Sequence, residues 1–446
     1  MFFCPPLFPA DKNLYLAGRS SFQNDAKFRI RKLSEPRIDK EKIRDMIARQ
    51  IKPGIQSLVA IDWDRKLFDQ LVPLPEGTTY NAYLVRGSEK TALVDTVYPP
   101  CTAELVALLK KQGLTRLDYI VSNHAEQDHS GSIPALLELY PEAKVVTNAK
   151  AKGLIAESLL VTEDKFIEVK DGDTLSLGDK TLQFLLMPWV HWPDTMSTYV
   201  VEDRILFTCD FFGSHLASSS LYAHDEPAVE LAASRYYAEI MMPFRVHIVK
   251  HLKRLAPLAI DYIAPSHGPV YDRPAFILDL YRRWVSGAPR PEVVIPYVSM
   301  YDSTTTMVNY LIDRLMEKGL TVKPHNMVEA DMGKFAHTLV EASTVVFATP
   351  AVLAGPHPDI VTAAYLMNAL RPKTKLVSVI GSFGWGGDIV SKKIVELLGG
   401  LQKQIQFLDP VLVKGLPKSK DFQALDALVE QIFQANQEFT KQKTAR

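Results

Sequence analysis

The chain has 446 residues, of which 47% are hydrophobic and 23% are charged, as in ordinary globular proteins. This length exceeds what one hydrophobic core usually supports, so two domains are expected. Lys plus Arg and Asp plus Glu both total 51, so the charge balance indicates neither nucleic acid nor an anionic membrane surface as a partner.

The cysteine pattern argues against a disulfide framework and against a cysteine-based zinc or iron–sulfur module. Cys4, Cys101 and Cys209 have no short paired spacing. No apolar run approaches the roughly 20 residues needed to span a bilayer. The apolar N-terminus contains prolines and lacks a basic start, which is not typical of a signal peptide. We therefore expect a cytoplasmic protein.

The first part of the chain shows mixed β and α patterns. Residues 1–50, Pro-rich and then charged, form an N-terminal extension of unassigned role that is helix-compatible at 39–50. Beyond Ile55, short β-type runs alternate with turn signals. Strands are expected at 81–85, 92–95, 119–122, 144–147, 181–186, 204–208 and 261–264, and helices at 102–112 and 133–139. This mixture of hairpins and strand–helix units predicts a layered αβ domain over residues 51–288.

A second domain follows a linker rich in Gly and Pro at 286–291. Beyond it, strands are expected at 292–298, 344–348 and 375–380. Helices are expected at 304–318, 358–370, 388–398 and 422–439. Buried β-branched strands that alternate with amphipathic helices indicate an α/β fold with a doubly wound parallel sheet. We assign this domain to residues 289–446.

Several potential metal ligands lie directly after expected strands. Four of them occupy six positions after the run at 119–122, and three more follow later strands. Side chains at strand ends are held by the sheet while they face open space, as a metal site requires. A polar, solvated loop is the alternative for the first cluster alone, but the whole set favours a metal site. The candidate ligands are His124, Glu126, Asp128, His129, His191, Asp210 and His267.

Three loops of the second domain are candidates for a cofactor site. The first is rich in hydroxyl groups and precedes a helix, whose N-terminus offers free N–H groups to a phosphate. A simple helix cap is the alternative. All three follow strands whose carboxyl ends bind ligands in doubly wound sheets. For Trp385, the alternative to a cofactor contact is a core position. The candidates are Ser299, Met300, Tyr301, Asp302, Ser303, Thr304, Thr349, Pro350, Ala351, Ser382, Phe383, Gly384, Trp385 and Gly386.

The ligand series His-x-Glu-x-Asp-His, followed by a distant His, an Asp and a His, resembles that of the metallo-β-lactamase superfamily. With Glu126 at its second position, the series resembles that of the A-type flavodiiron proteins. A carboxylate there adds a hard, charged oxygen donor, which suits iron better than zinc. Segments 61–64, 77–83, 95–97, 191–196 and the Gly-Ser-aromatic-Gly-Trp loop at 381–385 also resemble that family. The resemblance extends from about Ile55 to the C-terminus.

This resemblance implies an αββα metallo-β-lactamase-like sandwich followed by a flavodoxin-like domain, with FMN and two non-haem irons. It implies that His124, Glu126 and His191 hold one iron and that Asp128 and His267 hold the other. Asp210 would bridge the two metals. Ligation by His129 stays open, because the equivalent histidine does not always bind iron in this family.

The implied reaction is reduction of O2 to water, or of NO to nitrous oxide, by a head-to-tail homodimer or homotetramer. Electrons would pass through FMN from rubredoxin or another external donor, possibly a reduced deazaflavin. Alternative functions are a zinc-dependent hydrolase with an accessory flavodoxin-like domain and a non-catalytic electron carrier. Two residues depart from the family pattern. Asp302 stands where many relatives of this fold have Gly, which leaves flavin affinity open. Asp69 stands near a position where many members have His, which leaves substrate preference open.

Overall fold

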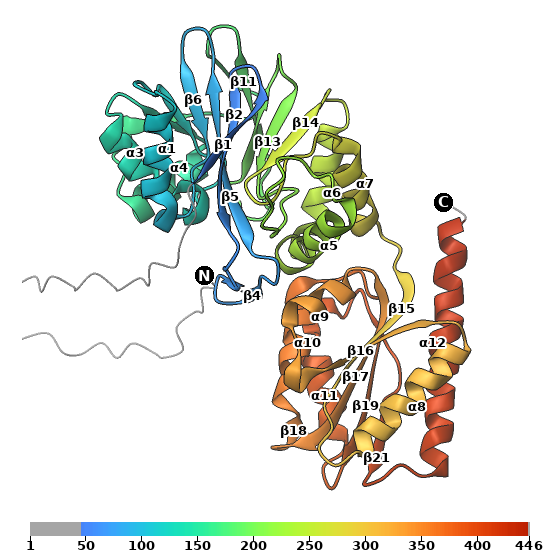
Figure 1. The fold of residues 1–446 in the computed structure, drawn as a ribbon. Coiled ribbons are helices and arrows are strands. Elements are labelled where there is room, and N and C mark those ends of the chain that lie inside the picture. The colour runs from blue at the N-terminus through green and yellow to red at the C-terminus, as the bar shows by residue number, and fades with distance from the viewer. Residues whose placement is uncertain (1–45, 445–446) are drawn as a thin grey trace, which may run out of the picture. The chain divides into compact units, whose positions relative to one another are not determined.

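The computed structural model describes residues 46–444, shown as a coloured ribbon in Figure 1. The extension expected at the N-terminus, together with Cys4, lies outside these residues up to position 45. Strand β1 (Ile47–Lys52) pairs with β2 (Ile55–Asp62) in an antiparallel ladder. The helix-compatible interpretation was therefore wrong for residues 47–50, because strand pairing overrides weak helix propensity.

The first half of the described chain contains two large sheets. The seven-stranded sheet has the order β1-β2-β5-β6-β7-β8-β9, and the five-stranded sheet runs from β10 to β14 in sequence order. Apolar side chains from both sheets, including Tyr83 from the seven-stranded sheet and Phe207 from the five-stranded sheet, share one core. The remaining strands of the first sheet are β5 (Thr78–Arg86), β6 (Thr91–Val94), β7 (Tyr119–Val121), β8 (Lys144–Thr147) and β9 (Phe166–Glu168). Those of the second are β10 (Thr174–Ser176), β11 (Thr181–Leu186), β12 (Met196–Val200), β13 (Ile205–Cys209) and β14 (Tyr262–Pro265).

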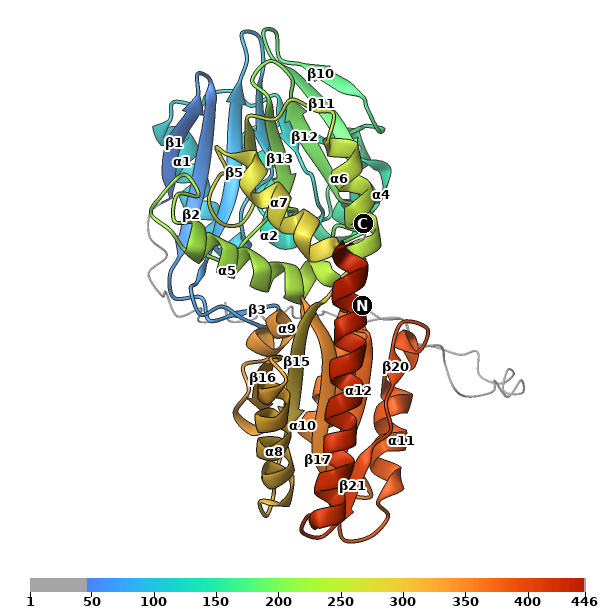
Figure 2. The ribbon, with the colours of Figure 1, turned by 90° about the vertical axis from the view of Figure 1, so that its right-hand side faces the viewer.

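Helices cover the outer faces of these two sheets (Figures 1 and 2). Helices α1 (Thr102–Lys111), α3 (Ile133–Leu139) and α4 (Ala149–Leu159) share a core with the seven-stranded sheet. Helices α5 (Glu226–Tyr236), α6 (Arg245–Leu255) and α7 (Pro274–Val285) share a core with the five-stranded sheet. The predicted αββα sandwich is therefore confirmed.

The second half contains one parallel sheet of order β16-β15-β17-β19-β20. Counted from its first strand in sequence, this is the order 2-1-3-4-5 of flavodoxin-like folds. Its strands are β15 (Arg290–Tyr297), β16 (Thr321–Asn326), β17 (Ala342–Val352), β19 (Leu376–Phe383) and β20 (Gln406–Phe407). The predicted doubly wound parallel sheet is confirmed, with the unpredicted strands β16 and β20 at its two edges.

Helices pack on both faces of this parallel sheet. Helices α8 (Ser303–Glu317) and α12 (Ser419–Thr444) bury apolar stripes on one face, among them Met307, Leu311 and Leu315 at helical spacing. Helices α9 (Met332–Leu339), α10 (Pro358–Leu370) and α11 (Asp388–Leu397) cover the other face. Among the described residues, no helix is long and apolar enough to cross a bilayer.

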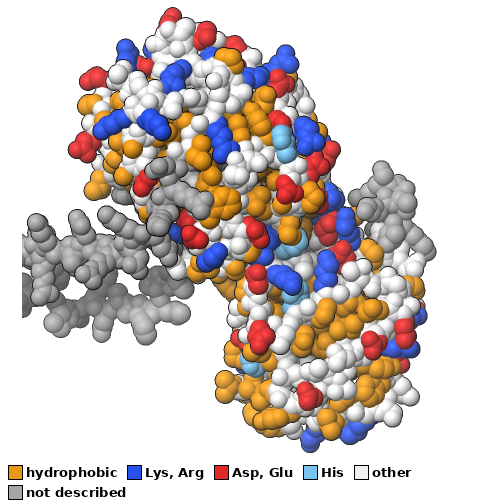
Figure 3. Space-filling view, viewed as in Figure 1, with side chains coloured by type: hydrophobic (Ala, Val, Ile, Leu, Met, Phe, Trp, Pro, Cys, Tyr) orange, Lys and Arg blue, Asp and Glu red, His pale blue; other side chains and the backbone are white. Residues whose placement is uncertain are grey.

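The two halves are packed together over a continuous apolar core, in which Trp284 of α7 and Val294 of β15 belong to one cluster. Arg235 of α5 forms a paired hydrogen bond with Asp331, the residue that caps α9. The domain boundary near residue 290 stays a prediction. On the face shown in Figure 3, acidic and basic side chains are interspersed.

Candidate metal centre

All seven predicted ligands lie together at the strand ends of the two facing sheets. His124 follows β7, Asp210 follows β13 and His267 follows β14. His191 lies in the loop after β11, and Glu126 is the N-cap residue of the short helix α2 (Gln127–Ser130). Residues Asp128 and His129 lie within α2. The strand-end pattern therefore predicted a real convergence of side chains.

The first half of the cluster contains four ligand-type side chains. Nε2 of His124 and Nε2 of His191 each lie 3.2 Å from Oε2 of Glu126. Oδ2 of Asp210 lies 3.6 Å from the His124 nitrogen and 3.5 Å from the His191 nitrogen. One ligand atom of each of these four residues lies within 4.8 Å of the others. This arrangement surrounds a single point with two imidazoles and two carboxylates.

The second half of the cluster is arranged like the first half around the same residue, Asp210. Oδ1 and Oδ2 of Asp128 lie 3.2 Å and 3.1 Å from Nε2 of His129 and Nε2 of His267, respectively. Oδ1 of Asp210 lies 3.0 Å from the His129 nitrogen and 3.6 Å from the His267 nitrogen. Asp210 thus directs one carboxylate oxygen toward each pair of histidines, as a carboxylate that bridges two metal ions would.

The donor atoms of this cluster fit a pair of metal ions. Both carboxylate oxygens of Asp128, Nε2 of His129 and Oδ2 of Asp210 are buried without a partner in hydrogen-bond geometry. Such atoms are costly to bury unless a ligand satisfies them. Imidazole nitrogens and carboxylate oxygens are the donors that suit iron. Burial raises the pKa of the neighbouring Cys209 thiol well above its usual range, which disfavours the thiolate that would bind a metal.

Protein groups behind the histidines fix which ring nitrogen faces the cluster. Nδ1 of His124 lies 3.0 Å from Oδ2 of Asp194, and Nδ1 of His267 lies 2.7 Å from the carbonyl oxygen of Thr79. Each contact directs Nε2 toward the cluster, as such outer partners do in metal sites. Sequence reasoning did not assign Asp194 or Thr79 a role. Both lie in segments that resemble family signatures, 191–196 and 77–83.

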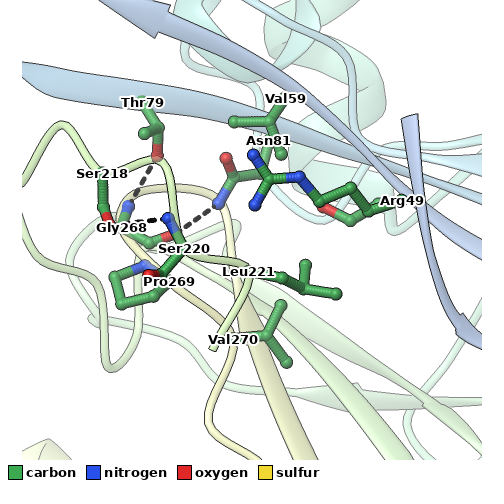
Figure 4. Close-up of a pocket in the computed structure, with 11 residues that line it drawn as sticks. Arg49, Val59, Thr79, Asn81, Ser218, Ser220, Leu221, Gly268, Pro269 and Val270 are labelled. Carbon is green, nitrogen blue, oxygen red and sulfur yellow. Dashed lines mark hydrogen bonds between the residues drawn. The ribbon is translucent and has the colours of Figure 1, made fainter. Parts of the chain in front are cut away.

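The turn that carries His267 is held by side chains of strand β5, and Figure 4 shows Thr79 and Asn81 of this strand beside Gly268. The Thr79 hydroxyl accepts a 2.7 Å hydrogen bond from the backbone N–H of Gly268. The side-chain amide of Asn81 donates to the carbonyl oxygens of Pro265 and Gly268 at 2.9 and 2.8 Å. Gly268 has a φ of +80°, and a Cβ there would collide with the Ser214 hydroxyl. Only glycine therefore fits directly after this histidine.

Two further polar side chains line the inner wall of the centre. The Tyr236 hydroxyl donates a 2.8 Å hydrogen bond to Oδ1 of Asp210. The His215 ring lies 5.0 Å from the ring of His267, and its Nδ1 lies 2.9 Å from the Thr78 hydroxyl. Burial and the adjacent His267 hold the pKa of His215 well below its usual range, so this ring is neutral.

Opposite charges within the cluster stabilise one another. Burial opposes ionisation of Asp210, but His129 and His191 outweigh it and hold the pKa of the carboxyl well below its usual range. Burial likewise opposes protonation of His129, but Asp128 and Asp210 raise its pKa well above the usual range. The Asp210 carboxylate is therefore ionised, and it supplies negative charge that attracts metal cations.

Asp69 lies close enough to the cluster to be affected by its charge. Partial burial and repulsion by Glu126, Asp128 and Asp210 raise the pKa of Asp69 to about 6. Its backbone has a φ of +49°, in the left-handed region. The structure thus places near the centre the residue that the sequence singled out as a departure from the family.

The predicted cofactor loops meet at the carboxyl ends of β15, β17 and β19, which are neighbours in the sheet. The Thr304 and Ser382 hydroxyls lie 3.2 Å apart, so the first and third loops are in contact. The Ser299 hydroxyl accepts a hydrogen bond from the backbone N–H of Thr305 at the start of α8. Gly381 lies so close to Thr349 that a Cβ would collide with its carbonyl oxygen.

Large side chains at these loops face solvent in the single chain. Trp385 is 72% exposed and Tyr301 is 83% exposed. The core position considered for Trp385 is therefore wrong, because the side chain is not packed inside the domain. Exposed rings at strand ends of a doubly wound sheet are available to stack on a flat cofactor.

Comparison with known proteins places the chain in a family. A family model described as ODP family beta lactamase matches residues 78–268. A nitric oxide reductase from Moorella thermoacetica is 36% identical over 380 residues, which cover 84% of this chain and 95% of that protein. A rubredoxin-oxygen oxidoreductase from Megalodesulfovibrio gigas is 31% identical over 398 residues, which cover 87% of this chain and 98% of that protein.

Solved structures give the same result. The rubredoxin oxygen:oxidoreductase from the anaerobe Desulfovibrio gigas matches with a TM-score of 0.84 and 30% identity, over 88% of this chain and 100% of that chain. The flavodiiron protein from Giardia intestinalis matches with a TM-score of 0.81 and 26% identity, over 90% of this chain and 99% of that chain. From its sequence relatives, its fold and its buried His and carboxylate cluster, the chain belongs to the flavodiiron protein family and is an oxidoreductase of that type.

Proposed function

We propose that this protein reduces O2 to water, NO to nitrous oxide, or both, at a non-haem diiron centre that receives electrons from FMN. The observation that carries the proposal is the position of Asp210, which directs one oxygen toward His124 and His191 and the other toward His129 and His267. A shared carboxylate between two sets of donors favours two metal ions over one.

For the metal ligands we propose two groups that share Asp210. One iron is held by His124, Glu126 and His191, and the other by Asp128, His129 and His267. His129 is included because its buried Nε2 lies as close to Asp210 as any other histidine nitrogen and has no hydrogen-bond partner. Replacing His129 with Asn is expected to lower the iron content below two per chain, whereas an unchanged content would remove His129 from the ligand set.

For FMN we propose the three contiguous loops as the binding site. The phosphate is held by the hydroxyl groups and free backbone N–H groups of the first loop at the N-terminus of α8. The flat ring lies against the second and third loops, where a Cβ at Gly384 or Gly386 would meet no atom within 4 Å, so the backbone is open to close approach. The proposed contacts are Ser299, Met300, Tyr301, Asp302, Ser303, Thr304, Thr349, Pro350, Ala351, Ser382, Phe383, Gly384, Trp385 and Gly386.

The chemistry that two irons and FMN supply when bound is the capture of O2 or NO and the transfer of electrons to it. The chain's own residues hold this centre rigid. Asp194 and the Thr79 carbonyl orient His124 and His267, and Tyr236 orients Asp210. The ligands are largely buried, and the most open of them are Glu126 and His191, whose side chains are 17% and 16% exposed.

For partners we propose an external electron donor and a second copy of this chain. The relative from Megalodesulfovibrio gigas is named a rubredoxin-oxygen oxidoreductase, which supports a rubredoxin as the donor; a reduced deazaflavin is the second option. A head-to-tail homodimer or homotetramer would cover the exposed rings of Trp192, beside His124, and of Trp385. An active monomer in sedimentation experiments would contradict this assembly. The two buried free thiols, Cys101 and Cys209, support a cytoplasmic location.

The test is consumption of O2 and of NO, measured separately with electrodes on anaerobically purified, reduced protein. Rapid consumption of at least one gas is expected, and Asp210→Asn and His191→Ala are expected to abolish it. Equal consumption by these variants would favour an electron carrier. Hydrolysis of ester or lactam substrates by zinc-loaded, flavin-free protein would favour the hydrolase.

A further inference from the structure

A cavity of about 380 Å³ lies behind the metal centre, between α5 and the segment that contains Pro73 and Pro75. One water molecule needs only about 10–15 Å³ of such space, so the cavity has room for a chain of waters. Leu231, which is 53% exposed, lies on its wall, and Glu76 at its rim is also exposed. The cavity therefore communicates with solvent.

One face of a single helix forms much of the cavity wall. Its lining residues recur at intervals of three and four positions, as expected for one side of a helix. The face passes from Leu231 and Ala232 to Arg235 and Tyr236 and reaches Glu239 one turn later. Glu239 lies in a short π-helical turn, Tyr237–Met241, that continues α5. Such turns recur at functional sites.

The cavity reaches the two side chains that touch the metal centre from behind. The Tyr236 hydroxyl donates a hydrogen bond to Asp210, and the His215 ring lies 5.0 Å from the ring of His267 in a tilted arrangement. Nε2 of His215 is buried without a hydrogen-bond partner, although the ring lines the cavity. The cavity thus extends to two side chains, Tyr236 and His215, that contact the buried side of the cluster.

Glu239 is a buried carboxyl that shares this cavity. Its side chain is only 6% exposed, and helix α9 packs directly over it. A Cβ at Gly333 of α9 would collide with Oε1 of Glu239, so glycine permits this close packing. The carboxyl is therefore withdrawn from bulk water yet open to the cavity.

The charged groups around Glu239 offset little of the cost of burying its negative charge. Arg235 of α5 approaches Oε1 at 3.5 Å, but the same guanidinium makes three shorter contacts, at 3.2, 3.3 and 3.2 Å, with Asp331 before α9. Across the cavity lie Glu76 and the neutral ring of His215. Burial, only partly offset by Arg235, raises the pKa of Glu239 to about 7, with a further contribution from Asp331. A proton on this carboxyl is exchangeable near neutral pH, as a proton donor requires.

We propose that Glu239 is a proton-relaying residue for the metal centre and that it supplies protons to the reaction through this cavity. The inference rests on the proposed function. Reduction of one O2 to two waters consumes four electrons and four protons, and reduction of two NO to nitrous oxide and water consumes two of each. For every proton delivered, the Glu239 O–H bond breaks toward a cavity water, and the carboxylate takes a proton from solvent in return.

The experiment uses the iron- and FMN-loaded protein. The reduced enzyme is mixed rapidly with O2, and reoxidation of the flavin is followed from pH 5.5 to 9. For the wild type, the rate is expected to fall as the pH rises through about 7, where Glu239 loses its proton. Glu239→Gln is expected to be at least about tenfold slower below pH 7 and to lose this pH dependence. Glu239→Asp, which keeps a carboxyl, is expected to restore part of both.

The matched control is Glu230→Gln, which changes a glutamate on the same helix α5 away from the cavity face. Glu230 forms a half-exposed pair with Arg283, so its loss is expected to leave the rate and the pH profile unchanged. Iron and FMN contents of all variants are measured first, so that rates are compared per loaded centre.

A second readout does not depend on turnover. Infrared difference spectra between pH 6 and pH 8 are expected to show a protonated carboxyl band that disappears in Glu239→Gln. Absence of this band in the wild type, or a Glu239→Gln variant with the wild-type rate or pH profile, would overturn the role of Glu239. A wild type that shows the band but consumes neither gas would instead contradict the proposed function.

Discussion

The Tyr236 hydroxyl lies 2.8 Å from Oδ1 of Asp210 and donates a hydrogen bond to the carboxylate that faces both pairs of histidines. Because the Asp210 carboxylate is ionised, this hydrogen bond contributes about 1.5–3 kcal/mol to holding the carboxylate in place. Tyr236→Phe is therefore expected to reduce O2 or NO consumption about tenfold while the chain retains iron. The measurement is the turnover rate per bound iron.

The neighbouring tyrosine provides the control for this substitution. The Tyr237 hydroxyl is buried without a hydrogen-bond partner, so Tyr237→Phe removes the same atom without loss of a contact. An equal loss of activity in both variants would show that packing, and not the hydrogen bond to Asp210, determines the effect.

Asp194 is expected to determine iron affinity although it lies outside the proposed ligand set. Its Oδ2 lies 3.0 Å from Nδ1 of His124 and also accepts the backbone N–H of Ala125. Loss of such an outer partner typically weakens metal binding about 10–100-fold. The Asp194→Asn variant is therefore expected to lose its iron to a competing chelator at a chelator concentration about 10–100-fold lower than the wild type requires. Asp171→Asn, at an exposed carboxylate, is the control, and equal retention of iron in both variants would contradict the role.

Asp302 is expected to weaken FMN binding. It precedes α8 with a φ of +61°, and its side chain makes no capping hydrogen bond. Asp302→Gly would remove both the repulsion of a phosphate and the strain of a left-handed side-chain residue, each worth about 1 kcal/mol or more. The dissociation constant of FMN, measured from flavin fluorescence on the apoprotein, is expected to fall about tenfold. A rise would show that the Asp302 carboxylate supports the loop.

Glu239 is also expected to make stability depend on pH. Its pKa of about 7 in the folded chain exceeds the ordinary glutamate value of 4.5, so the folded state binds the proton more tightly than the unfolded state. Stability is therefore expected to decrease as the pH rises from about 4.5 through 7, by up to about 3 kcal/mol.

Glu239→Gln removes this penalty, because the amide does not ionise. Its melting temperature by circular dichroism is expected to exceed that of the wild type at pH 8 and to match it near pH 5. A variant that is less stable than the wild type at pH 8 would show that the ionised carboxyl is well compensated by Arg235.

Much of the fold was predictable because the strands are short, apolar and clearly bounded. The expected strand at 144–147 and the expected helices at 133–139 and 358–370 match β8, α3 and α10 residue for residue. Strand β1 was missed because its residues are mixed and its strand state depends on pairing with β2. Strand β16 was missed because it carries polar residues at an edge, with five of its six positions exposed or partly exposed.

The convergence of the candidate ligands was predictable because strand ends bring distant positions to one edge of a sheet. The groups behind them were not, because their roles depend on three-dimensional contacts. Tyr236 lies 26 positions from Asp210 in sequence, and nothing in its local pattern distinguishes it from a core tyrosine. Glu239 likewise has the sequence pattern of an ordinary helical glutamate, and only the packing of Gly333 over it shows that it is buried.

The most direct test of the account is the metal content of protein purified under nitrogen without chelators, measured by mass spectrometry. Two irons per chain are predicted, because Asp210 faces two separate sets of donors that include Glu126 and Asp128. Two zincs per chain, or no bound metal, would contradict the diiron centre and direct attention to the hydrolase or the electron carrier.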